Sequence, residues 1–292
     1  MSIPDDRPAT WFVTGTSRGL GLELAVQVLE RGDNLAATTR SVERLASALA
    51  GRVDTAKLLA LEVDLRDAAA VAGAVEQTTA RFGALDVVVN NAGYGFLAAV
   101  EETSVDEVRD MLDVQVVGVW NVLRAALPVL RNQRSGHIVT VSSVLGLTAV
   151  PGWALYCAGK FAVEGISEAL AGEVADFGVE VTIVEPGYFR TDFLTTDSLG
   201  LPAATSDGYP AIREMVQSHL ELQGSQLGDP VKGAERIVAK VVDGGGPLRL
   251  ILGSDSHAYA TAKVEALQAN LDDARDTAAR TDHATLAEGV SA

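Results

Sequence analysis

The sequence of 292 residues predicts an α/β fold in which one parallel sheet is covered by helices on both faces. Short runs rich in apolar residues alternate with longer stretches that repeat their apolar residues at the helical period. These runs are apolar nearly throughout, as is typical of strands buried on both faces. A glycine-rich turn follows the first run, where such sheets bind ligands. We therefore expect a doubly wound sheet of about seven strands.

Each element follows from its own stretch of sequence. The strands are expected at Thr10–Thr14, Asn34–Thr39, Lys57–Val63, Leu85–Asn90, His137–Ser143, Val179–Val184 and Leu248–Leu252. The helices are expected at Gly19–Arg31, Asp67–Phe82, Ser104–Arg131, Trp153–Phe177 and Ser254–Asn270. Gly32 ends the first of these helices, and Pro128 is expected to kink or shorten the third.

The chain is expected to form one domain over residues 1–292, with its core at 10–252. Residues 192–229 have weak periodicity and scattered Gly, Pro, Ser and Thr, so we expect helices and loops that form a substrate lid over one edge of the sheet. A C-terminal helix and tail follow at 254–292, and the last residues, such as Ala284 to Ala292, are expected to be poorly fixed.

Charge and composition exclude several classes of function. The chain has 39 acidic and 23 basic residues and a net charge of −16, which disfavours nucleic-acid binding. The single cysteine, Cys157, fits a reducing, cytoplasmic compartment. No signal peptide is evident, and no apolar run approaches the 18 or more residues of a membrane-spanning helix. The four histidines lack metal-ligand spacing, so no metal is expected.

The turn after the first strand reads Thr14-Gly15-Thr16-Ser17-Arg18-Gly19-Leu20-Gly21. Its spacing is G-x-x-x-G-x-G and differs from the commoner G-x-G-x-x-G. Glycines permit a tight turn and close backbone approach, and the helix that follows directs its N-terminal N–H groups and dipole at a pyrophosphate. A plain glycine-rich turn is the alternative. The flanking strand and helix favour phosphate binding.

The end of the second strand indicates which dinucleotide is preferred. A carboxylate there binds the ribose 2′-hydroxyl of NAD, whereas an arginine accommodates the 2′-phosphate of NADP. Here the strand ends in Arg40 with no carboxylate, and Arg18 lies inside the glycine turn. Each charge-assisted contact contributes about 1.5–3 kcal/mol. Two solvated surface arginines are the alternative, and NADP(H) is the better interpretation.

Three residues further along suggest acid–base chemistry. Ser143 ends the fifth predicted strand, and Tyr156 and Lys160 are four residues apart on one face of the following helix. An unperturbed tyrosine has a pKa near 10, and an adjacent ammonium is expected to lower that pKa toward the working range. Ser143 would then hold a carbonyl oxygen while Tyr156 gives or takes the proton.

With these motifs in their order, the chain resembles the compact branch of the short-chain dehydrogenase/reductase family, which has a Rossmann-type fold. The resemblance covers about Thr10 to Leu252. The motifs that carry it are T14-G-T-S-R-G-L-G21, Asp64-Leu65, N90-N-A-G93, Ser143, Y156-C-A-G-K160 and P186-G-Y-F-R-T191.

The resemblance implies a role for each motif. Asp64 would bind the adenine amine, Leu65 would flank that ring, and Asn91 with Ala92 and Gly93 would lie along the adenosine ribose. Tyr156 would be the proton donor or acceptor, and Lys160 would also bind the nicotinamide ribose. The nicotinamide carboxamide would be fixed by Pro186, Gly187, Phe189 and Thr191. The cofactor phosphates would lie against Gly15, Ser17, Arg18, Gly19, Leu20 and Gly21.

One residue departs from the family pattern. The family usually has an asparagine in its long fourth helix, where its main-chain carbonyl holds a water that relays protons to the lysine. This chain has Gln115 there. Glutamine keeps that carbonyl, but its extra methylene can displace the water or alter the bend of the helix. We expect retained and slower chemistry, with Gln115 as a fourth candidate catalytic residue.

The resulting hypothesis is an NADPH-dependent carbonyl reductase, reversible as an alcohol dehydrogenase. Apolar residues near the site predict a hydrophobic carbonyl or alcohol substrate bound by Ser143, Leu145, Trp153, Tyr156, Tyr188 and Phe193. The alternative from another class is a regulatory protein that senses NADP(H) without chemistry; a sugar-nucleotide epimerase fits the length and glycine spacing less well. The resemblance implies pairing through the helices at 104–131 and 153–177, and we expect a homodimer, with a tetramer as the alternative.

Overall fold

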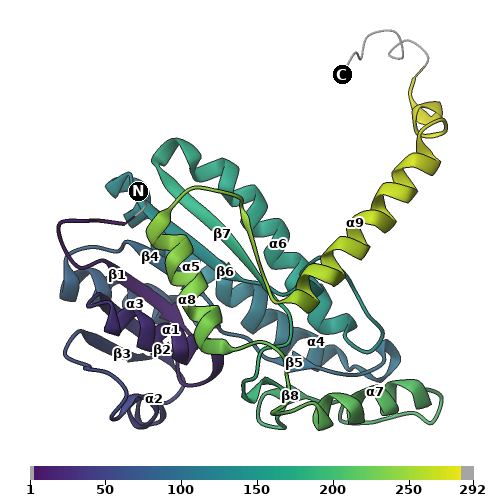
Figure 1. Ribbon diagram of the computed structural model, residues 1–292, viewed down its shortest axis with the longest axis horizontal. Helices are drawn as coiled ribbons and strands as arrows, with labels where there is room; N and C mark the ends of the chain where they lie inside the picture. Colours follow the sequence, from purple (N-terminus) through teal and green to yellow (C-terminus); the bar gives the residue numbers. More distant parts are fainter. Residues whose placement is uncertain (1–2, 284–292) are drawn as a thin grey trace.

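The computed structural model describes residues 3–283 and is built on a seven-stranded parallel sheet (Figure 1). The strand order is β3-β2-β1-β4-β6-β7-β9. The chain adds β2 and β3 on one side of β1 and then crosses over to add β4, β6, β7 and β9 on the other side, as in a doubly wound fold. The strands are β1 (Thr10–Thr14), β2 (Asn34–Thr39), β3 (Leu58–Glu62), β4 (Val87–Asn90), β6 (Gly136–Val141), β7 (Val179–Pro186) and β9 (Arg249–Leu252). The fold class predicted from the sequence is confirmed.

Helices cover both faces of the sheet (Figure 1). They are α1 (Gly19–Glu30), α2 (Val42–Leu49), α3 (Ala68–Phe82), α4 (Val105–Leu112), α5 (Gly118–Gln133), α6 (Ala154–Val174), α7 (Pro210–Glu221), α8 (Pro230–Asp243) and α9 (Ser254–Ala274). Along β1, Trp11 and Val13 face the core under α1, α2 and α8, whereas Phe12 faces the core under α3, α5 and α6. Successive strand residues thus bury opposite faces, which explains the uninterrupted apolar runs.

Two helices and a small strand pair were not predicted from the sequence. In α2, Ser41 caps the helix by accepting a hydrogen bond from the Arg44 N–H, and Leu45 and Leu49 pack into the core one turn apart. In α8, Asp229 is the cap and Pro230 opens the first turn. The strands β5 (Gly95–Phe96) and β8 (Leu199–Gly200) pair with each other outside the main sheet. Each strand of this pair has only two residues, too few for a periodic signal.

The fifth predicted strand ends earlier than expected. The range His137–Ser143 is wrong at both ends, because β6 runs from Gly136 to Val141. Ser143 therefore lies two residues past the strand, at the start of a short 3₁₀ turn over Val144–Gly146. Its hydroxyl accepts a hydrogen bond from the Leu145 N–H, and this cap stops the strand.

The long helix predicted at 104–131 is a composite of α4, a π-helical turn at Asp113–Val117, and α5. Pro128 lies inside α5 without ending it. The combined stretch Val105–Gln133 is long and apolar enough to cross a membrane by length and composition alone, so the expectation that no stretch reaches that length is wrong. Its apolar residues Val122, Ala126 and Leu130 are fully buried in the core beside the sheet, which accounts for the composition.

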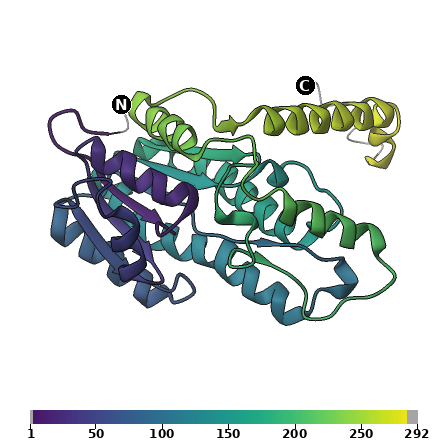
Figure 2. The same cartoon turned by 60° about the horizontal axis from the view of Figure 1, so that its bottom comes forward.

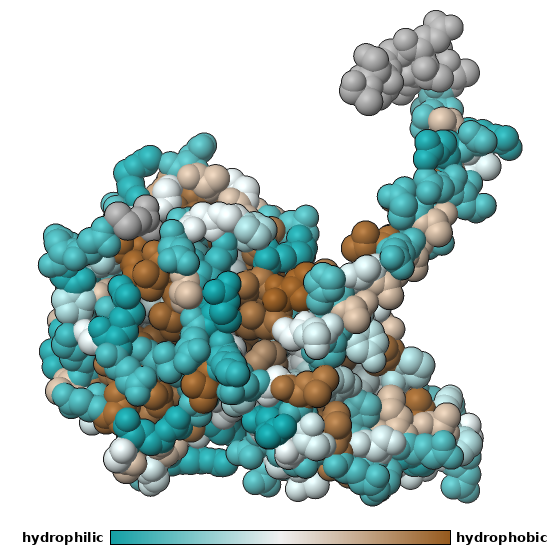
Figure 3. All heavy atoms as spheres, viewed as in Figure 1, coloured by the Kyte–Doolittle hydropathy of each residue, from teal (hydrophilic) through white to brown (hydrophobic). Residues whose placement is uncertain are grey.

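The C-terminal helix α9 leaves the body of the molecule at an angle (Figures 1 and 2). Only its first turns are anchored, because Ser256 and Ala260 are its buried residues. Figure 3 shows its outer part as mostly hydrophilic. The expected mobile tail at 284–292 lies outside the described residues.

Candidate functional site

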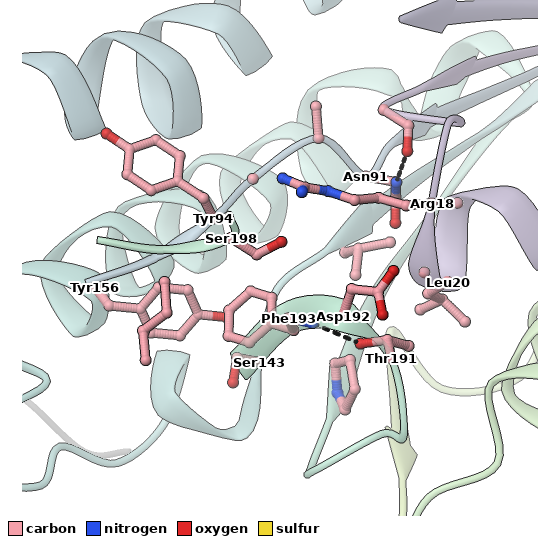
Figure 4. A pocket seen from close by; sticks show the side chains of 18 of the residues that line it. Arg18, Leu20, Asn91, Tyr94, Ser143, Tyr156, Thr191, Asp192, Phe193 and Ser198 are labelled. Atoms are coloured by element: carbon pink, nitrogen blue, oxygen red, sulfur yellow. Dashed lines mark hydrogen bonds between the residues drawn. The ribbon is translucent and has the colours of Figure 1, made fainter. Parts of the chain in front are cut away.

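A cavity of about 810 Å³ lies at the carboxyl ends of the strands, next to the point where the sheet reverses. Figure 4 shows Tyr156, Ser143 and Phe193 gathered on one side of it, with Arg18 and Leu20 on the other. Of the site residues predicted from the sequence, the cavity is lined by Gly15, Ser17, Arg18, Gly19, Leu20, Gly21, Arg40, Asp64, Leu65, Asn91, Ala92, Gly93, Ser143, Leu145, Trp153, Tyr156, Lys160, Pro186, Gly187, Tyr188, Phe189, Thr191 and Phe193.

The glycine turn requires its glycines. Gly15 has φ = +71°, and a Cβ there would lie 2.8 Å from the Ala92 Cα. A Cβ at Gly21 would lie 2.3 Å from both the Asn91 Nδ2 and the Gly15 carbonyl oxygen. The turn therefore packs directly on the end of β4, and α1 begins at Gly19 with its free N–H groups beside the cavity.

Asn91 braces this turn. Its side-chain Nδ2 donates to the Thr14 carbonyl at 2.8 Å and to the Gly15 carbonyl at 3.0 Å, and its backbone N–H donates to the Thr14 hydroxyl. Asn91 lines the cavity as expected. Its amide nitrogen is engaged with the glycine turn, which links β4 to the start of α1.

Arginines gather at the same end. Arg18 is half-buried, and its pKa is lowered by burial and then by the nearby charges of Arg44 and Arg40. Its guanidinium donates to the Asp197 carbonyl through both terminal nitrogens, each at 3.2 Å. Arg44, in the first turn of α2, was not predicted from the sequence. Three like charges thus lie near one another in a chain of net charge −16.

Asp64 is held by an arginine that the sequence reasoning missed. Its carboxylate accepts hydrogen bonds from the Arg66 side chain at 2.7 to 3.1 Å, and these bonds lower the pKa of Asp64. Both side chains are about half exposed at the rim of the cavity. The signal in the sequence was the i, i+2 spacing of opposite charges directly after β3.

The three candidate reactive residues, Ser143, Tyr156 and Lys160, lie together at one end of the cavity. Tyr156 lies in the first turn of α6, with a side-chain hydrogen bond to Ser143. Lys160 lies one turn later, its Nζ 5.5 Å from the Tyr156 ring centroid. The same Nζ donates to the Val141 carbonyl at 2.9 Å, which fixes the ammonium against the end of β6.

The ionisation of Tyr156 differs from the sequence expectation. Burial raises its pKa above the ordinary value, and the hydrogen bond with Ser143 opposes that effect. Burial also lowers the pKa of Lys160 to about 8, against the charge of Glu164. The net shift of the Tyr156 pKa is therefore upward, whereas the sequence predicts a downward shift, because burial is its largest cause.

Gln115 is the one candidate that does not line the cavity. It lies in the π-helical turn and is 2% exposed. Its Nε2 donates to the Tyr94 carbonyl at 2.7 Å, whereas its Oε1 has no hydrogen-bond partner among residues 3–283. The side chain lies between Gly93 and Gly159, where added Cβ atoms would be 3.4 to 3.8 Å from it. Gln115 therefore fills space behind Lys160.

Aromatic residues form the apolar side of the cavity. The Tyr156 ring meets Trp153 at 5.3 Å and Phe193 at 5.8 Å between centroids, both edge to face. The Tyr188 hydroxyl is 2.8 Å from the His219 Nε2, and the His219 Nδ1 is 2.8 Å from the Met215 carbonyl. His219 belongs to α7, within the predicted lid segment, and was missed because it lies 31 residues from Tyr188.

The loop after β7 is anchored from the far end of the chain. Asp255, in the first turn of α9, accepts a hydrogen bond from the Tyr188 N–H at 2.7 Å. A Cβ at Gly187 would lie 2.2 Å from the Asp255 Oδ1, so the loop and α9 pack without space between them. Phe189 packs its ring on Gly228 and Gly233 at the entry to α8.

The chain is similar in sequence to known oxidoreductases. Residues 9–200 match the family model described as short chain dehydrogenase. The chain is 38% identical over 260 residues to "Oxidoreductase BOA17" of Botryotinia fuckeliana, covering 89% of this chain and 94% of that protein. It is 36% identical over 199 residues to the "3-ketodihydrosphingosine reductase" of Bacteroides thetaiotaomicron, covering 68% and 70%.

Solved structures share the fold. A short-chain dehydrogenase from Streptomyces avermitilis superposes with a TM-score of 0.86 at 33% identity, covering 96% of this chain and 100% of that one. More distant structures from Burkholderia phymatum, solved with NAD, and Burkholderia cenocepacia, solved with NADP, have TM-scores of 0.79 and 0.70 at 21% and 24% identity. They cover 92% and 91% of this chain, and 97% of each structure is covered.

Proposed function

The chain is an oxidoreductase that belongs to the short-chain dehydrogenase family, and from that premise we propose that it is an NADPH-dependent reductase of ketones or aldehydes. The reaction is reversible as an alcohol oxidation. One observation carries the proposal: Ser143, Tyr156 and Lys160 converge at one end of a cavity whose other end is formed by the glycine turn and arginines. A binding protein without chemistry has no need of the first three residues.

The residues present fit a phosphorylated dinucleotide. The close approach at Gly15 and Gly21 keeps side chains out of the turn, and the N–H groups at the start of α1 are free to bind phosphate oxygens. Arg40, with Arg18 and Arg44 beside it, would hold a ribose 2′-phosphate. Lys160 would bind the nicotinamide ribose from its position on α6. Relatives of this fold crystallised with NAD and with NADP support a nicotinamide dinucleotide, and the arginines favour NADPH.

The residues perform the proton part of the reaction. When bound, the reduced nicotinamide supplies a hydride to the substrate carbonyl carbon. Ser143 donates a hydrogen bond to the carbonyl oxygen, and the Tyr156 O–H bond breaks as that oxygen takes up the proton. The Lys160 ammonium stabilises the tyrosinate left behind. Because the tyrosine pKa lies well above neutral, Tyr156 carries the proton that reduction requires, and the neighbouring Lys160 ammonium offsets part of the cost of releasing it.

The substrate is a hydrophobic small molecule. Leu145, Trp153, Tyr188 and Phe193 surround the reactive end of the cavity with apolar surface. The relative named 3-ketodihydrosphingosine reductase acts, by its name, on a ketone. Both observations support a bulky apolar ketone over a charged metabolite.

We also propose that the protein is cytoplasmic and forms a homodimer. The exposed large apolar residues Val117 (43%), Trp120 (53%) and Phe161 (42%) lie on the helices expected to pair two copies. An apolar set of this kind on a long helix pair is typical of a protein interface.

A kinetic experiment tests the proposal. We expect purified protein to consume NADPH, followed by absorbance at 340 nm, with at least one of a panel of aromatic and long-chain aliphatic ketones. NADPH that binds tightly without turnover on any member of the panel would favour the regulatory alternative. No binding of either dinucleotide would contradict both.

Cofactor preference is tested separately with Arg40→Asp. We expect it to weaken NADPH binding about ten- to a hundredfold, because a charge-assisted hydrogen bond is lost. NADH binding should change far less. Arg236→Asp is the matched control, because it makes the same charge change at an exposed position of α8 outside the cavity. Equal losses for NADPH and NADH in the Arg40 variant would refute the 2′-phosphate assignment.

A further inference from the structure

A cluster of charged side chains, two of them buried, lies beside the proposed reactive residues without lining the cavity. Glu164 of α6, Glu185 of β7 and Arg249 of β9 form it. Arg249 Nη2 is 3.3 Å from Glu164 Oε2, and Arg249 Nε is 3.1 Å from Glu185 Oε1. Glu164 is 5% exposed and Glu185 is fully buried. Nothing in the proposed reaction so far uses these three residues.

Burial makes it unfavourable for both carboxyl groups of the cluster to be ionised at once. Two buried carboxyl groups face one guanidinium, and burial raises the pKa of both, that of Glu185 to about 7. Two neighbouring carboxyls in such a site do not both ionise readily. Glu185 has no exposure at all, whereas Glu164 also contacts the Ser142 hydroxyl. Burial therefore favours a proton on Glu185, the more deeply buried of the two, while Arg249 contacts both carboxyl groups.

Glu164 is coupled to Lys160. The two residues are one helical turn apart on the same face of α6, and the Glu164 charge favours the lysine ammonium. Residues at the end of β6 contact both side chains. Lys160 Nζ donates to the Val141 carbonyl, and Ser142, which follows Val141, lies against Glu164. A Cβ at Gly146 would lie 2.5 Å from the Ser142 Oγ and 3.1 Å from the Glu164 Oε1, so only glycine leaves room for the pair.

We propose that Glu164 is a positioning residue for the reductase: its carboxylate, held ionised by Arg249 beside a protonated Glu185, keeps Lys160 charged and fixed against the end of β6. The inference rests on the proposed function in one respect, that the Lys160 ammonium acts beside Tyr156. The groups facing the cluster are Ser142 from the loop directly after β6, Glu185 from β7, Arg249 from β9, and Lys160 and Glu168 from α6 itself.

The chain offers a matched control. Glu168 lies one turn beyond Glu164 on the same helix and contacts the same Arg249, at 2.8 Å, but its side chain is 62% exposed. A substitution there removes one carboxylate and one ion pair with the same guanidinium. It does not remove a buried charge beside Lys160.

The test measures the titration of Lys160 in cofactor-free protein by carbon-13 NMR of the lysine side chains, with the signal assigned by Lys160→Arg. We expect Glu164→Gln to lower the midpoint of the Lys160 titration by about one pH unit, because a nearby opposite charge shifts a pKa by about one to three units. Glu168→Gln should leave it unchanged, and Glu164→Asp should restore most of it. Identical Lys160 titrations in wild type and Glu164→Gln would overturn the inference.

A second variant covers the case in which Glu164→Gln does not fold. Arg249→Gln removes the guanidinium that keeps Glu164 ionised, so the Lys160 midpoint should fall in the same direction; an unchanged midpoint would count against the inference. In turnover, the alkaline loss of kcat should move to lower pH by the same amount in Glu164→Gln, with little change in KM. Because the NMR titration needs neither cofactor nor substrate, it still decides the role of Glu164 if the chain reduces no carbonyl compound.

Discussion

Tyr156 and Lys160 illustrate how burial and charge compete at the scale of single residues. Trp153 and Phe193 cover the tyrosine ring edge to face, which removes water and raises the phenol pKa. The same loss of water brings the pKa of Lys160 down to about 8. Near neutral pH, the tyrosine therefore keeps its proton, whereas the lysine is close to losing one.

The Lys160 pKa predicts the alkaline limit of activity. The ammonium is required beside Tyr156, and it exists below a pKa of about 8 and is lost above it. We therefore expect kcat for ketone reduction to fall about tenfold per pH unit well above pH 8. The measurement is kcat from pH 6 to 10 at saturating substrate and NADPH. A rate that stays level to pH 10 would contradict the assigned role of Lys160.

The sequence could identify the reactive residues because their relation is local. Tyr156 and Lys160 share a helix face through their i, i+4 spacing, and Ser143 follows a recognisable strand. It could not give the direction of the tyrosine pKa shift, because that depends on burial by Phe193, which lies 37 residues away. Arg44 and His219 were missed for the same reason, since only the fold brings them to Arg18 and Tyr188.

At the scale of elements, the loop after β7 depends on α9. Asp255 accepts the Tyr188 N–H, and Ser256 donates to the Glu185 carbonyl at 2.8 Å, so the first turn of α9 clamps both ends of the segment from Glu185 to Tyr188. That segment contains Pro186 and Gly187, which line the cavity. A helix that projects from the body thus organises a wall of the proposed cofactor site.

Asp255→Ala tests this clamp. The Tyr188 N–H loses its acceptor, so we expect the protein to lose about 1–3 kcal/mol of unfolding free energy and the KM for NADPH to rise several-fold. Thermal or urea unfolding and steady-state kinetics measure the two effects. Asp272→Ala on the same helix is the control, because its ion pair with Arg275 is exposed and should contribute little. Equal effects of both substitutions would show that Asp255 has no special role.

The main elements were predictable wherever their apolar pattern was long. The strands Thr10–Thr14 and Asn34–Thr39 have the predicted bounds, because buried parallel strands are apolar throughout. The eight residues of α2 span little more than two turns, and a helix of that length leaves a weak periodic signal. The π-helical turn places the Gln115 side chain beside Gly93 and Gly159, and no local pattern encodes these contacts.

At the scale of the whole molecule, the surface of α5 and α6 bears on assembly. Val117 at the end of the π-helical turn, Trp120 of α5 and Phe161 of α6 leave apolar side chains exposed in a chain that is otherwise strongly acidic. The projecting α9 has apolar residues of its own, Val264, Leu267 and Leu271, which are also exposed. The two surfaces lie on different elements, so a substitution in one does not alter the other.

Trp120→Glu tests the proposed dimer. A buried, unpaired carboxylate at the centre of an apolar interface costs several kcal/mol, so we expect the variant to be monomeric at micromolar concentration. Light scattering after gel filtration measures the mass. Leu271→Glu makes a similar change on α9 and should leave the dimer intact. A wild-type protein that is itself monomeric, or a Trp120 variant that remains dimeric, would contradict the assignment of this face.

The proposed proton transfer is tested most directly by Tyr156→Phe, measured for both turnover and binding. The substitution removes one hydroxyl and keeps the ring that packs on Trp153 and Phe193. We expect NADPH to bind with nearly unchanged affinity while kcat for ketone reduction falls by about 10² to 10⁴, the contribution of a positioned proton donor. A variant that binds NADPH and reduces the ketone as fast as wild type would show that the proton comes from elsewhere.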